Sequence, residues 1–307
     1  MAKLISVIVP LYNEEEVLHE SYRRLSTVLS AMEEDYELIF INDGSRDKTF
    51  SMAKAIQEKD KHVVLIDFAR NFGHQIAVTA GLDQAKGDAV VIIDADLQDP
   101  PELIPKMVEM WKNGAEVVYG KRVSRKGETI FKKLTAFAYY RILDWLSGWK
   151  IPKDTGDFRL MDKKVADVMR SMREHNRFLR GMVAWVGFRQ EPIEFVREER
   201  FAGETKYTFK KMLCLATDGI ISFSGRPFGV MRWGGGALLN AGLLLLLALV
   251  IALFFTAVEG WLWVLGAVLV TSGLNLIALG VCGIYFERMY DELKGRPLYI
   301  ARDVHRS

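Results

Sequence analysis

The stretch that constrains this chain most is Val90–Pro100, which reads V-V-I-I-D-A-D-L-Q-D-P. It opens with four β-branched apolar residues, the pattern of a strand buried on both faces at the centre of a parallel sheet. Asp94 and Asp96 follow at once, and ligands of open α/β sheets bind beyond the carboxyl ends of strands. Two carboxylates at that position predict an oxygen site for a divalent cation that holds a diphosphate, with a surface turn as the alternative.

Strand and helix patterns alternate along the first part of the chain. The predicted strands are Leu4–Val9, Glu37–Ile41, Val63–Phe68, Ala89–Ile93 and Glu116–Tyr119. The predicted helices are Glu14–Ala31, Lys48–Lys59, Gly73–Ala85 and Glu102–Lys112. This alternation predicts βαβ units and a parallel, doubly wound α/β sheet. A chain of 307 residues accommodates one such domain plus an accessory part.

Three of these strands run into polar groups. The motifs are Pro10-Leu11-Tyr12-Asn13-Glu14, Asn42-Asp43-Gly44-Ser45 and Asp94-Ala95-Asp96-Leu97-Gln98. Each alone fits a turn or a helix cap, but all three fall on the same edge of a parallel sheet and so predict one site. The glycine-rich loops that cradle phosphate in dinucleotide and P-loop proteins are absent from the sequence. Phosphate would therefore be neutralised by a metal ion and by basic side chains.

Basic and aromatic residues are interleaved beyond the fifth strand. Lys121–Lys133 contains Arg122 and five other basic residues against the single acid Glu128, with apolar residues at helical spacing through Trp145. This pattern favours a basic amphipathic helix on an anionic lipid surface over a merely solvated charged face. In Gly156–Leu160, Asp157 and Arg159 point the same way if the segment is a strand, and an ion pair between them is the alternative to a functional role.

The last third of the chain changes in character. Residues 209–233 read as short amphipathic helices on a membrane surface, and Gly234–Val258 and Trp261–Phe286 are apolar runs. Each run is about 25 residues long, and about 20 residues suffice to cross the hydrocarbon core. Arg and Lys flank the pair on both outer sides, whereas the connection holds only Glu259 and Gly260. The positive-inside rule then places both termini and the domain 1–208 in the cytoplasm, with residues 287–307 as a basic tail.

The five motifs, in order, resemble those of family 2 glycosyltransferases, and more narrowly those of the polyprenyl-phosphate glycosyltransferases. The quoted residues are Pro10-Leu11-Tyr12-Asn13-Glu14, Asn42-Asp43-Gly44-Ser45, Arg70-Asn71-Phe72-Gly73, Asp94–Pro100 and Gly156-Asp157-Phe158-Arg159-Leu160. The two spans and the lead-in Arg200 to Tyr207 are similar to the bacterial bactoprenol glucosyltransferases. The resemblance covers essentially the whole chain and implies a GT-A (Rossmann-like) fold, Mg2+ or Mn2+, and inverting transfer of a hexose from a nucleotide sugar to undecaprenyl phosphate.

The resemblance also assigns roles to residues of this chain. Around the donor's base and ribose it places Pro10, Tyr12, Glu14 and Asp43. Asp94 would lie near the nucleotide and sugar, Asp96 and Gln98 would bind the metal, and Asp157 would lie near the sugar or acceptor. Phosphate contacts are implied for Arg122, with Arg200 and Lys206 nearby. Two departures are Asn42, where many relatives have Asp, and Thr205, where Ser is common. His74, which follows Gly73, is interpreted as a structural residue.

Several alternatives stay open. UDP-glucose is the expected donor, but mannose, N-acetylhexosamine and aminoarabinose donors are not excluded by the sequence. A processive polysaccharide synthase is disfavoured, because Arg232-Trp233 lacks the glutamine that completes its signature. A non-catalytic membrane adaptor would be expected to lose Asp94, Asp96 or Gln98, and two spans are few for a transporter. The expected location is the bacterial inner membrane. The expected partners are a UDP-sugar, polyprenyl phosphate, the membrane and possible further copies of the chain, but no nucleic acid.

Overall fold

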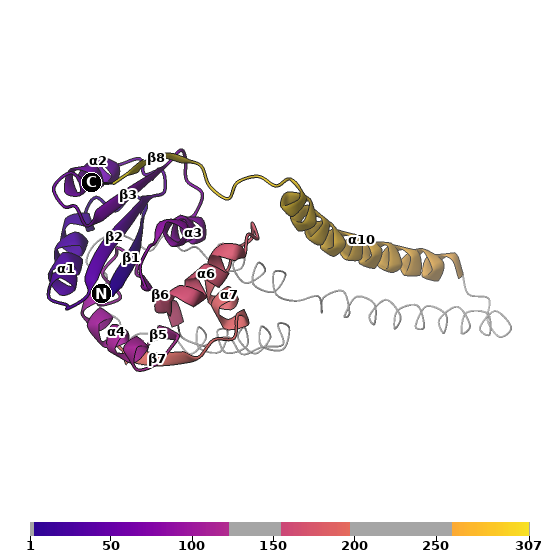
Figure 1. The fold of residues 1–307 in the computed structure, drawn as a ribbon. Coiled ribbons are helices and arrows are strands. Elements are labelled where there is room, and N and C mark those ends of the chain that lie inside the picture. Colours follow the sequence, from indigo (N-terminus) through magenta and orange to yellow (C-terminus); the bar gives the residue numbers. More distant parts are fainter. Residues whose placement is uncertain (1–2, 123–154, 197–259, 307) are drawn as a thin grey trace. The chain divides into compact units, whose positions relative to one another are not determined.

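The computed structural model describes residues 3–122, 155–196 and 260–306 (Figure 1). These residues divide into two compact units. The first, here called the sheet unit, comprises residues 3–122, 155–196 and 297–306, and the second comprises residues 260–296. The predicted contributions of Arg200 and Lys206, the basic segment beyond Arg122 and the predicted amphipathic helices at 209–233 all fall outside the described residues.

The sheet unit is built on a mixed sheet. In the described residues the sheet has eight strands in the order β7-β5-β6-β4-β1-β2-β3-β8. The strands are β1 (Leu4–Leu11), β2 (Asp35–Asn42), β3 (Val63–Phe68), β4 (Ala89–Ile92), β5 (Val117–Arg122), β6 (Thr155–Asp162), β7 (Gln190–Phe195) and β8 (Ala301–His305). The five strands predicted within residues 1–122 are therefore all present, with ends that differ by a few residues.

The prediction of a parallel sheet is correct for the centre and wrong for the whole. β1 pairs in parallel with β2 and β4, and β2 with β3, which is the doubly wound part. β6 lies antiparallel between β4 and β5, and β8 lies antiparallel along β3. Periodicity along the chain reports that a segment is a strand, but it does not report which distant strand becomes its neighbour.

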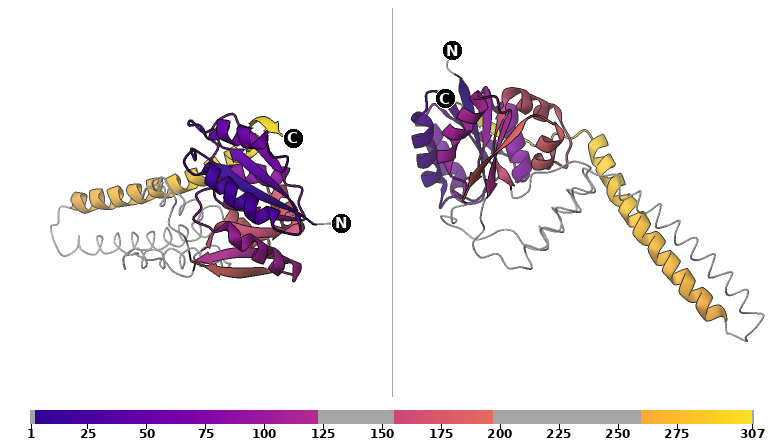
Figure 2. Two further views of the ribbon diagram at one scale, coloured as in Figure 1. Left: turned by 90° about the vertical axis from the view of Figure 1, so that its left-hand side faces the viewer. Right: turned by 90° about the horizontal axis from the view of Figure 1, so that it is seen from below.

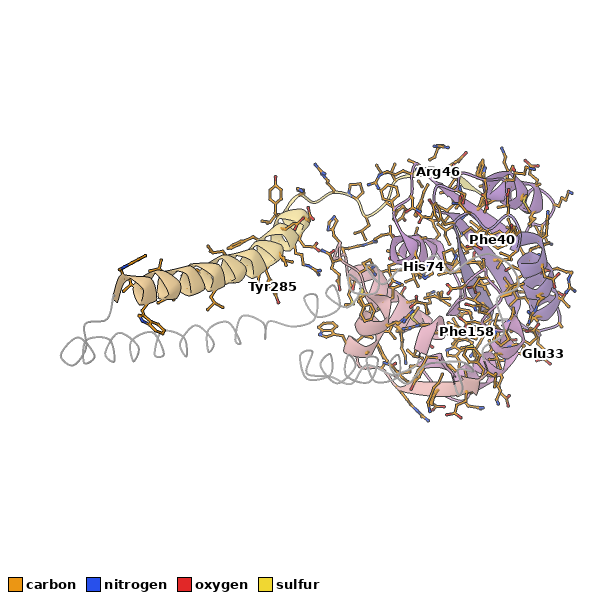
Figure 3. All side chains as sticks on the ribbon, turned by 180° about the vertical axis from the view of Figure 1, so that it is seen from behind. Glu33, Phe40, Arg46, His74, Phe158 and Tyr285 are labelled. Carbon is orange, nitrogen blue, oxygen red and sulfur yellow. The ribbon has the colours of Figure 1, made fainter. Side chains whose placement is uncertain are left out.

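Helices cover both faces of the sheet (Figures 1 and 2). They are α1 (Leu18–Ser30), α2 (Thr49–Gln57), α3 (His74–Gln84), the short 3-10 helix Pro101–Leu103, α4 (Ile104–Lys112), α6 (Lys163–Ser171) and α7 (Leu179–Trp185). The apolar faces of α1, α2 and α4 form one core with Val7, Phe40 and Val91 of the central strands (Figure 3 labels Phe40). On the opposite face α3 approaches so closely that a Cβ at Gly81 would lie 2.4 Å from Ile8 Cγ2. Alternate side chains of β1 are therefore buried in two separate layers, as expected for a central strand.

The topology brings the predicted polar motifs to one edge. β1, β2, β3 and β4 are mutually parallel, and β5 shares their direction because β6 is antiparallel to both β4 and β5. The strand order reverses at β1, because β2 and β3 lie on one side of it and β4 lies on the other. Ligands bind at such a switch point in open α/β sheets. The antiparallel β6 starts at this same edge, which brings Asp157 close to the end of β4.

The second unit contains the long helix α10 (Gly260–Leu293), which includes the second predicted span. Trp261, Trp263, Leu279, Phe286 and Leu293 are exposed large apolar side chains of this helix. In the part of the chain that the structure describes, no helix has the combination of length and apolar character needed to cross a membrane. The first predicted span, residues 234–258, lies outside that part, so the transmembrane hairpin stays a prediction.

Candidate active site

The loops that follow β1 and β2 are joined by hydrogen bonds from backbone N–H groups to side-chain oxygens. The Asn13 backbone N donates to Ser45 Oγ (3.1 Å), and Asn13 Oδ1 accepts from the Arg46 backbone N (2.8 Å). The Glu14 backbone N donates to Thr49 Oγ1 (2.8 Å). Asn13 has a φ of 53°, a left-handed conformation that asparagine tolerates better than most residues. The loops that carry the Pro10–Glu14 and Asn42–Ser45 motifs are thus hydrogen-bonded to each other, as expected for residues that follow neighbouring parallel strands.

Both carboxylate oxygens of Asp43 accept hydrogen bonds from the backbone of the loop after β3. Its Oδ1 accepts from Phe72 N (2.6 Å) and its Oδ2 from Gly73 N (3.0 Å), and the residue is only 3% exposed. Burial raises the pKa of Asp43 above its ordinary value, although the two backbone donors act in the opposite direction. The carboxylate therefore fixes the loop Ala69–Gly73. Its predicted contact with the donor base stays a prediction.

Asn42, the first departure from the family pattern, has a specific partner. Its Nδ2 donates to Asp67 Oδ1 at the end of β3 (2.7 Å), and both residues are buried. An aspartate at position 42 would face Asp67 with a second carboxylate and no proton to donate. The amide is thus matched to the buried carboxylate beside it.

This pairing predicts the effect of restoring the family residue. Asn42→Asp is expected to destabilise the protein by about 1–3 kcal/mol, because a buried hydrogen bond is replaced by repulsion between two carboxylates. Denaturant unfolding of the full chain measures the change. The double variant Asn42→Asp/Asp67→Asn restores one amide and one carboxylate and is expected to recover most of the loss. A fully stable single variant would contradict the pairing.

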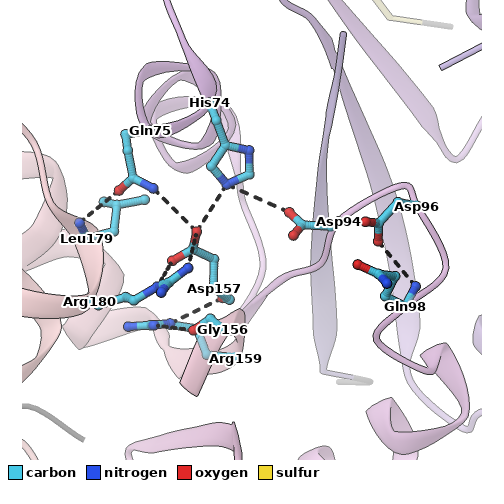
Figure 4. Close-up of polar contacts among 10 residues, drawn as sticks. All are labelled: His74, Gln75, Asp94, Asp96, Gln98, Gly156, Asp157, Arg159, Leu179 and Arg180. Carbon is cyan, nitrogen blue, oxygen red and sulfur yellow. Dashed lines mark hydrogen bonds and ion pairs between the residues drawn. The ribbon is translucent and has the colours of Figure 1, made fainter. Parts of the chain in front are cut away.

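The Asp94–Gln98 turn presents two oxygen-bearing side chains together. Asp96 Oδ1 accepts from the Gln98 backbone N (3.2 Å), and Leu97 between them has a φ of 59°. A left-handed leucine costs about 1–2 kcal/mol, and burial of its side chain to 3% exposure opposes that cost. Figure 4 shows the Asp96 and Gln98 side chains next to each other on this turn. Carboxylate and amide oxygens are the ligands that Mg2+ and Mn2+ prefer, so the pair fits a hard divalent ion.

The side chains that the structure describes do not complete a metal centre by themselves. Within the described ranges no group of three or more His, Cys, Asp or Glu side chains is arranged to hold an ion. Asp94 Oδ1 is buried and has no hydrogen-bond partner among those residues. Burial raises the pKa of Asp94, and the nearby charges of Asp157 and Asp96 act in the same direction while His74 opposes them. An unsatisfied buried oxygen of this kind is suited to a ligand that arrives from outside.

Asp157 is hydrogen-bonded to several residues of a second polar cluster, shown in Figure 4. Arg180 Nε donates to its Oδ1 (2.8 Å) and Arg180 Nη2 to its Oδ2 (3.3 Å). The same Oδ2 lies 3.2 Å from His74 Nε2 and accepts from Gln75 Nε2 (3.3 Å). Gln75 in turn accepts from the Leu179 backbone N (2.9 Å), which ties α3 to the start of α7. The cluster therefore joins β6, α3 and α7.

The charges in this cluster determine its protonation. Burial alone would raise the pKa of Asp157, but Arg180 and His74 hold it well below its ordinary value. Burial lowers the pKa of His74, yet the carboxylates of Asp94, 3.7 Å away, and Asp157 raise it to about 9. At neutral pH the cluster thus contains an ionised Asp157 and a protonated His74. A carboxylate held in this state is a counter-ion and an anchor, and it does not suit the role of a general base.

One alternative that the sequence left open, an ion pair between Asp157 and Arg159, is not observed. Asp157 does not pair with Arg159, whose Nε and Nη2 donate to the backbone oxygens of Asp157 (3.2 Å) and Gly156 (3.0 Å). Burial lowers the pKa of Arg159 to about 10. The ring of His74, interpreted from the sequence as structural, lies between Asp94 and Asp157, and this contact leaves that interpretation untested. Its position directly after the Arg70–Gly73 motif was an available signal, whereas nothing local marked Arg180.

Arg122 is the last residue of β5, where its backbone pairs in register with Phe195 of β7. That position lies on the same edge as the ends of β1 and β4, as the phosphate-binding prediction requires. Of the residues predicted to contact the donor, Pro10, Tyr12, Glu14, Asp43, Asp94 and Arg122 therefore converge on one edge of the sheet. Their contacts with ligand stay predictions.

Comparison with known proteins identifies the family. Residues 6–170 match the model of the family described as "Glycosyl transferase family 2". The chain belongs to glycosyltransferase family 2. The family match and the mixed α/β sheet confirm the expected GT-A-like fold of a family 2 enzyme.

Curated relatives of this family 2 enzyme match over nearly its full length. It is 52% identical to "Uncharacterized glycosyltransferase YkcC" of Bacillus subtilis (strain 168), covering 97% of this chain and 93% of the relative. It is 40% identical to "Prophage bactoprenol glucosyl transferase homolog" of Escherichia coli (strain K12), covering 98% and 99%. Among solved structures, glucosyl-3-phosphoglycerate synthase from Mycobacterium tuberculosis with Mn2+, UDP-glucose and phosphoglyceric acid is similar at 20% identity and a TM-score of 0.47, covering 71% and 78%.

Proposed function

We propose that this family 2 enzyme transfers a hexose, with glucose from UDP-glucose as the first candidate, to undecaprenyl or another polyprenyl phosphate. The observation that carries the proposal is the likeness, at 40% identity over 98% of the chain, to proteins named bactoprenol glucosyl transferase. The same donor site is compatible with mannose, N-acetylhexosamine or aminoarabinose, because such sugars differ in only a few contacts.

The chemistry follows from the charge distribution at the sheet edge. A phosphate oxygen of the acceptor attacks the anomeric carbon, the bond from that carbon to the diphosphate breaks, and the nucleoside diphosphate leaves with inversion. Asp96 and Gln98 would hold Mg2+ or Mn2+, which supplies charge neutralisation for the departing diphosphate. A lipid phosphate is already ionised, so the reaction needs no general base. This agrees with an Asp157 that stays ionised and fully hydrogen-bonded.

Cationic side chains support the acceptor half of the proposal. Protonated His74 and Arg180 lie beside Asp94 and Asp157, and Arg122 ends a strand at the same edge. Arg122 would position an anionic acceptor and reduce its repulsion with the donor diphosphate, whereas the charges of His74 and Arg180 are balanced by Asp94 and Asp157. We further propose that the apolar segments 234–258 and 261–286 anchor the enzyme in the bacterial inner membrane, with the sheet unit in the cytoplasm. The exposed tryptophans Trp261 and Trp263 are residues that favour membrane interfaces.

The test is a reconstituted transfer reaction. Purified full-length protein, undecaprenyl phosphate, Mg2+ or Mn2+ and UDP-glucose are expected to yield a glycosylated lipid phosphate and UDP. Parallel reactions with UDP-N-acetylglucosamine, GDP-mannose and UDP-aminoarabinose identify the donor by nucleotide release that depends on the lipid. Absence of lipid-dependent release with every donor would overturn the proposed function. Release without any lipid product would instead indicate hydrolysis.

A further inference from the structure

The segment Pro297–Arg306, here called the C-terminal tail, is part of the sheet unit although it follows α10 in sequence. Its strand β8 pairs antiparallel with β3, and the Ala69 backbone N donates to Ile300 O (3.0 Å). Arg302 Nη1 lies 3.4 Å from Asp67 Oδ2. The tail thus covers the strand that leads directly into the loop Ala69–Gly73.

An aromatic stack continues from the tail into this loop. The Tyr299 ring stacks on Phe68 with centroids 5.2 Å apart and planes at 21°. Phe68, which is 1% exposed, meets Phe72 edge-on at 5.5 Å and 83°. Tyr299 Oη also donates to Asp83 Oδ2 of α3 (3.1 Å), and burial raises the pKa of this tyrosine to about 12. The tail therefore holds both β3 and α3, the two elements that flank the loop.

The loop Ala69–Gly73 in turn contacts Asp43 of the predicted donor site. The backbone N–H groups of Phe72 and Gly73 bind both oxygens of Asp43. Gly44, the next residue, lies so close that a Cβ there would be 2.6 Å from Arg70 C and Asn71 N. The loops after β2 and β3 are therefore closely packed, and a shift of the Phe72 backbone would move an N–H group that binds Asp43.

A cavity marks the place where the tail meets both loops. It has a volume of about 160 Å³, and its lining includes Asn42, Gly44, Ser45, Arg70 and Arg302. Arg302 belongs to the tail, Asn42 ends β2, and the other three belong to the two loops. Removal of the tail would take away Arg302 from the wall of this cavity and leave the edge of β3 without its partner strand.

We infer that the C-terminal tail is a positioning element of the donor site, with Tyr299 as its principal positioning residue, so that nucleotide affinity depends on a segment beyond the predicted membrane anchor. The inference rests on the proposed function for the identity of the donor. It does not make Tyr299 a catalytic residue, because the tyrosine acts through Phe68 and Phe72 on Asp43.

The experiment compares tail variants of the full chain. Tyr299→Ala is expected to raise the KM for the nucleotide sugar, and the Kd for UDP with Mn2+ by calorimetry, about three- to tenfold, the range set by loss of one aromatic pair. The KM for lipid acceptor and kcat are expected to stay within about twofold of wild type, since the tail contacts seen among the described residues do not involve Asp157 or Arg180. Tyr299→Phe keeps the stack and is expected to bind nucleotide like wild type.

The matched control is Arg306→Gln, which removes another tail contact, from Arg306 Nη2 to Gln84, without touching the loop. Its donor KM is expected to be unchanged. If Tyr299→Ala fails to fold, Tyr299→Leu keeps apolar bulk without the stack and takes its place. Wild-type donor KM in the Ala or Leu variant, or equal changes in both KM values and kcat, would overturn the inference. Wild-type protein that neither binds a nucleotide nor transfers sugar would instead count against the proposed function.

Discussion

Replacing Asp96 by alanine is expected to lower turnover by roughly 100- to 1000-fold, because metal stabilisation of a leaving group supplies several kcal/mol and 1.36 kcal/mol is a factor of ten. The fold is expected to stay intact, since the side chain is half-buried and accepts a hydrogen bond from the Gln98 backbone N of its own turn. Transfer assays with saturating UDP-glucose measure the loss. Mn2+ binding in the presence of UDP, followed by electron paramagnetic resonance, measures the metal site independently of turnover.

The control for Asp96 is Asp88→Ala at the opposite end of the same strand. Asp88 is an exposed carboxylate that accepts from the Leu4 backbone N (3.0 Å). Its removal is expected to leave turnover within about twofold, because it lies at the amino end of β4, away from the ligand-binding edge. Retention of more than about a tenth of wild-type turnover in Asp96→Ala, or undiminished Mn2+ binding, would refute the assigned role of Asp96.

Removing Arg180 is expected to destabilise the folded protein. Arg180→Ala leaves the carboxylate of Asp157, whose side chain is 7% exposed, without its two-bond partner. Breaking a buried pair typically costs 3–5 kcal/mol; because Arg180 is 31% exposed, we expect about 2–4 kcal/mol here. That loss corresponds to a fall in Tm of about 5–15 °C. Thermal unfolding of the purified full chain, monitored by circular dichroism, measures it.

A matched arginine on the surface provides the comparison. Arg23 makes the same two-bond fork to Glu20, but it is 65% exposed. Arg23→Ala is expected to lower the Tm much less than Arg180→Ala does, because solvent screens an exposed pair. Arg180→Lys keeps the charge and loses the planar fork, so its stability is expected to fall between wild type and alanine. Equal effects of Arg180→Ala and Arg23→Ala would refute a central role for the Asp157 cluster.

The cluster also predicts a dependence of stability on pH. The folded state raises the pKa of His74 from an ordinary 6.5 to about 9. Its stabilising contribution is therefore fully present below about pH 6.5 and is lost as the pH rises through about 9. Wild type is expected to lose more Tm between pH 7 and pH 10 than His74→Gln does. Parallel Tm curves for the two proteins would show that His74 carries no such charge.

The sequence by itself determined the local features of the donor side. The run Val90–Ile93 identified a central strand, and the polar residues beyond three strands identified the edge at which they meet. These predictions succeeded because a strand and the residues directly after it are neighbours in the chain. In parallel βαβ units, chain order also determines the shared direction of the strands.

Only the tertiary structure decided which distant residues complete the site. β6 enters the sheet antiparallel between β4 and β5, and this places Asp157 beside Asp94. Arg180 and His74 then reach Asp157 from α7 and α3, and Tyr299 reaches Phe68 from beyond α10. None of these pairs is encoded in a local pattern, because strand pairing and burial across long separations depend on how the whole chain closes into one core. The donor motifs were readable along the chain, whereas the counter-ions that hold them in place depend on the closed fold.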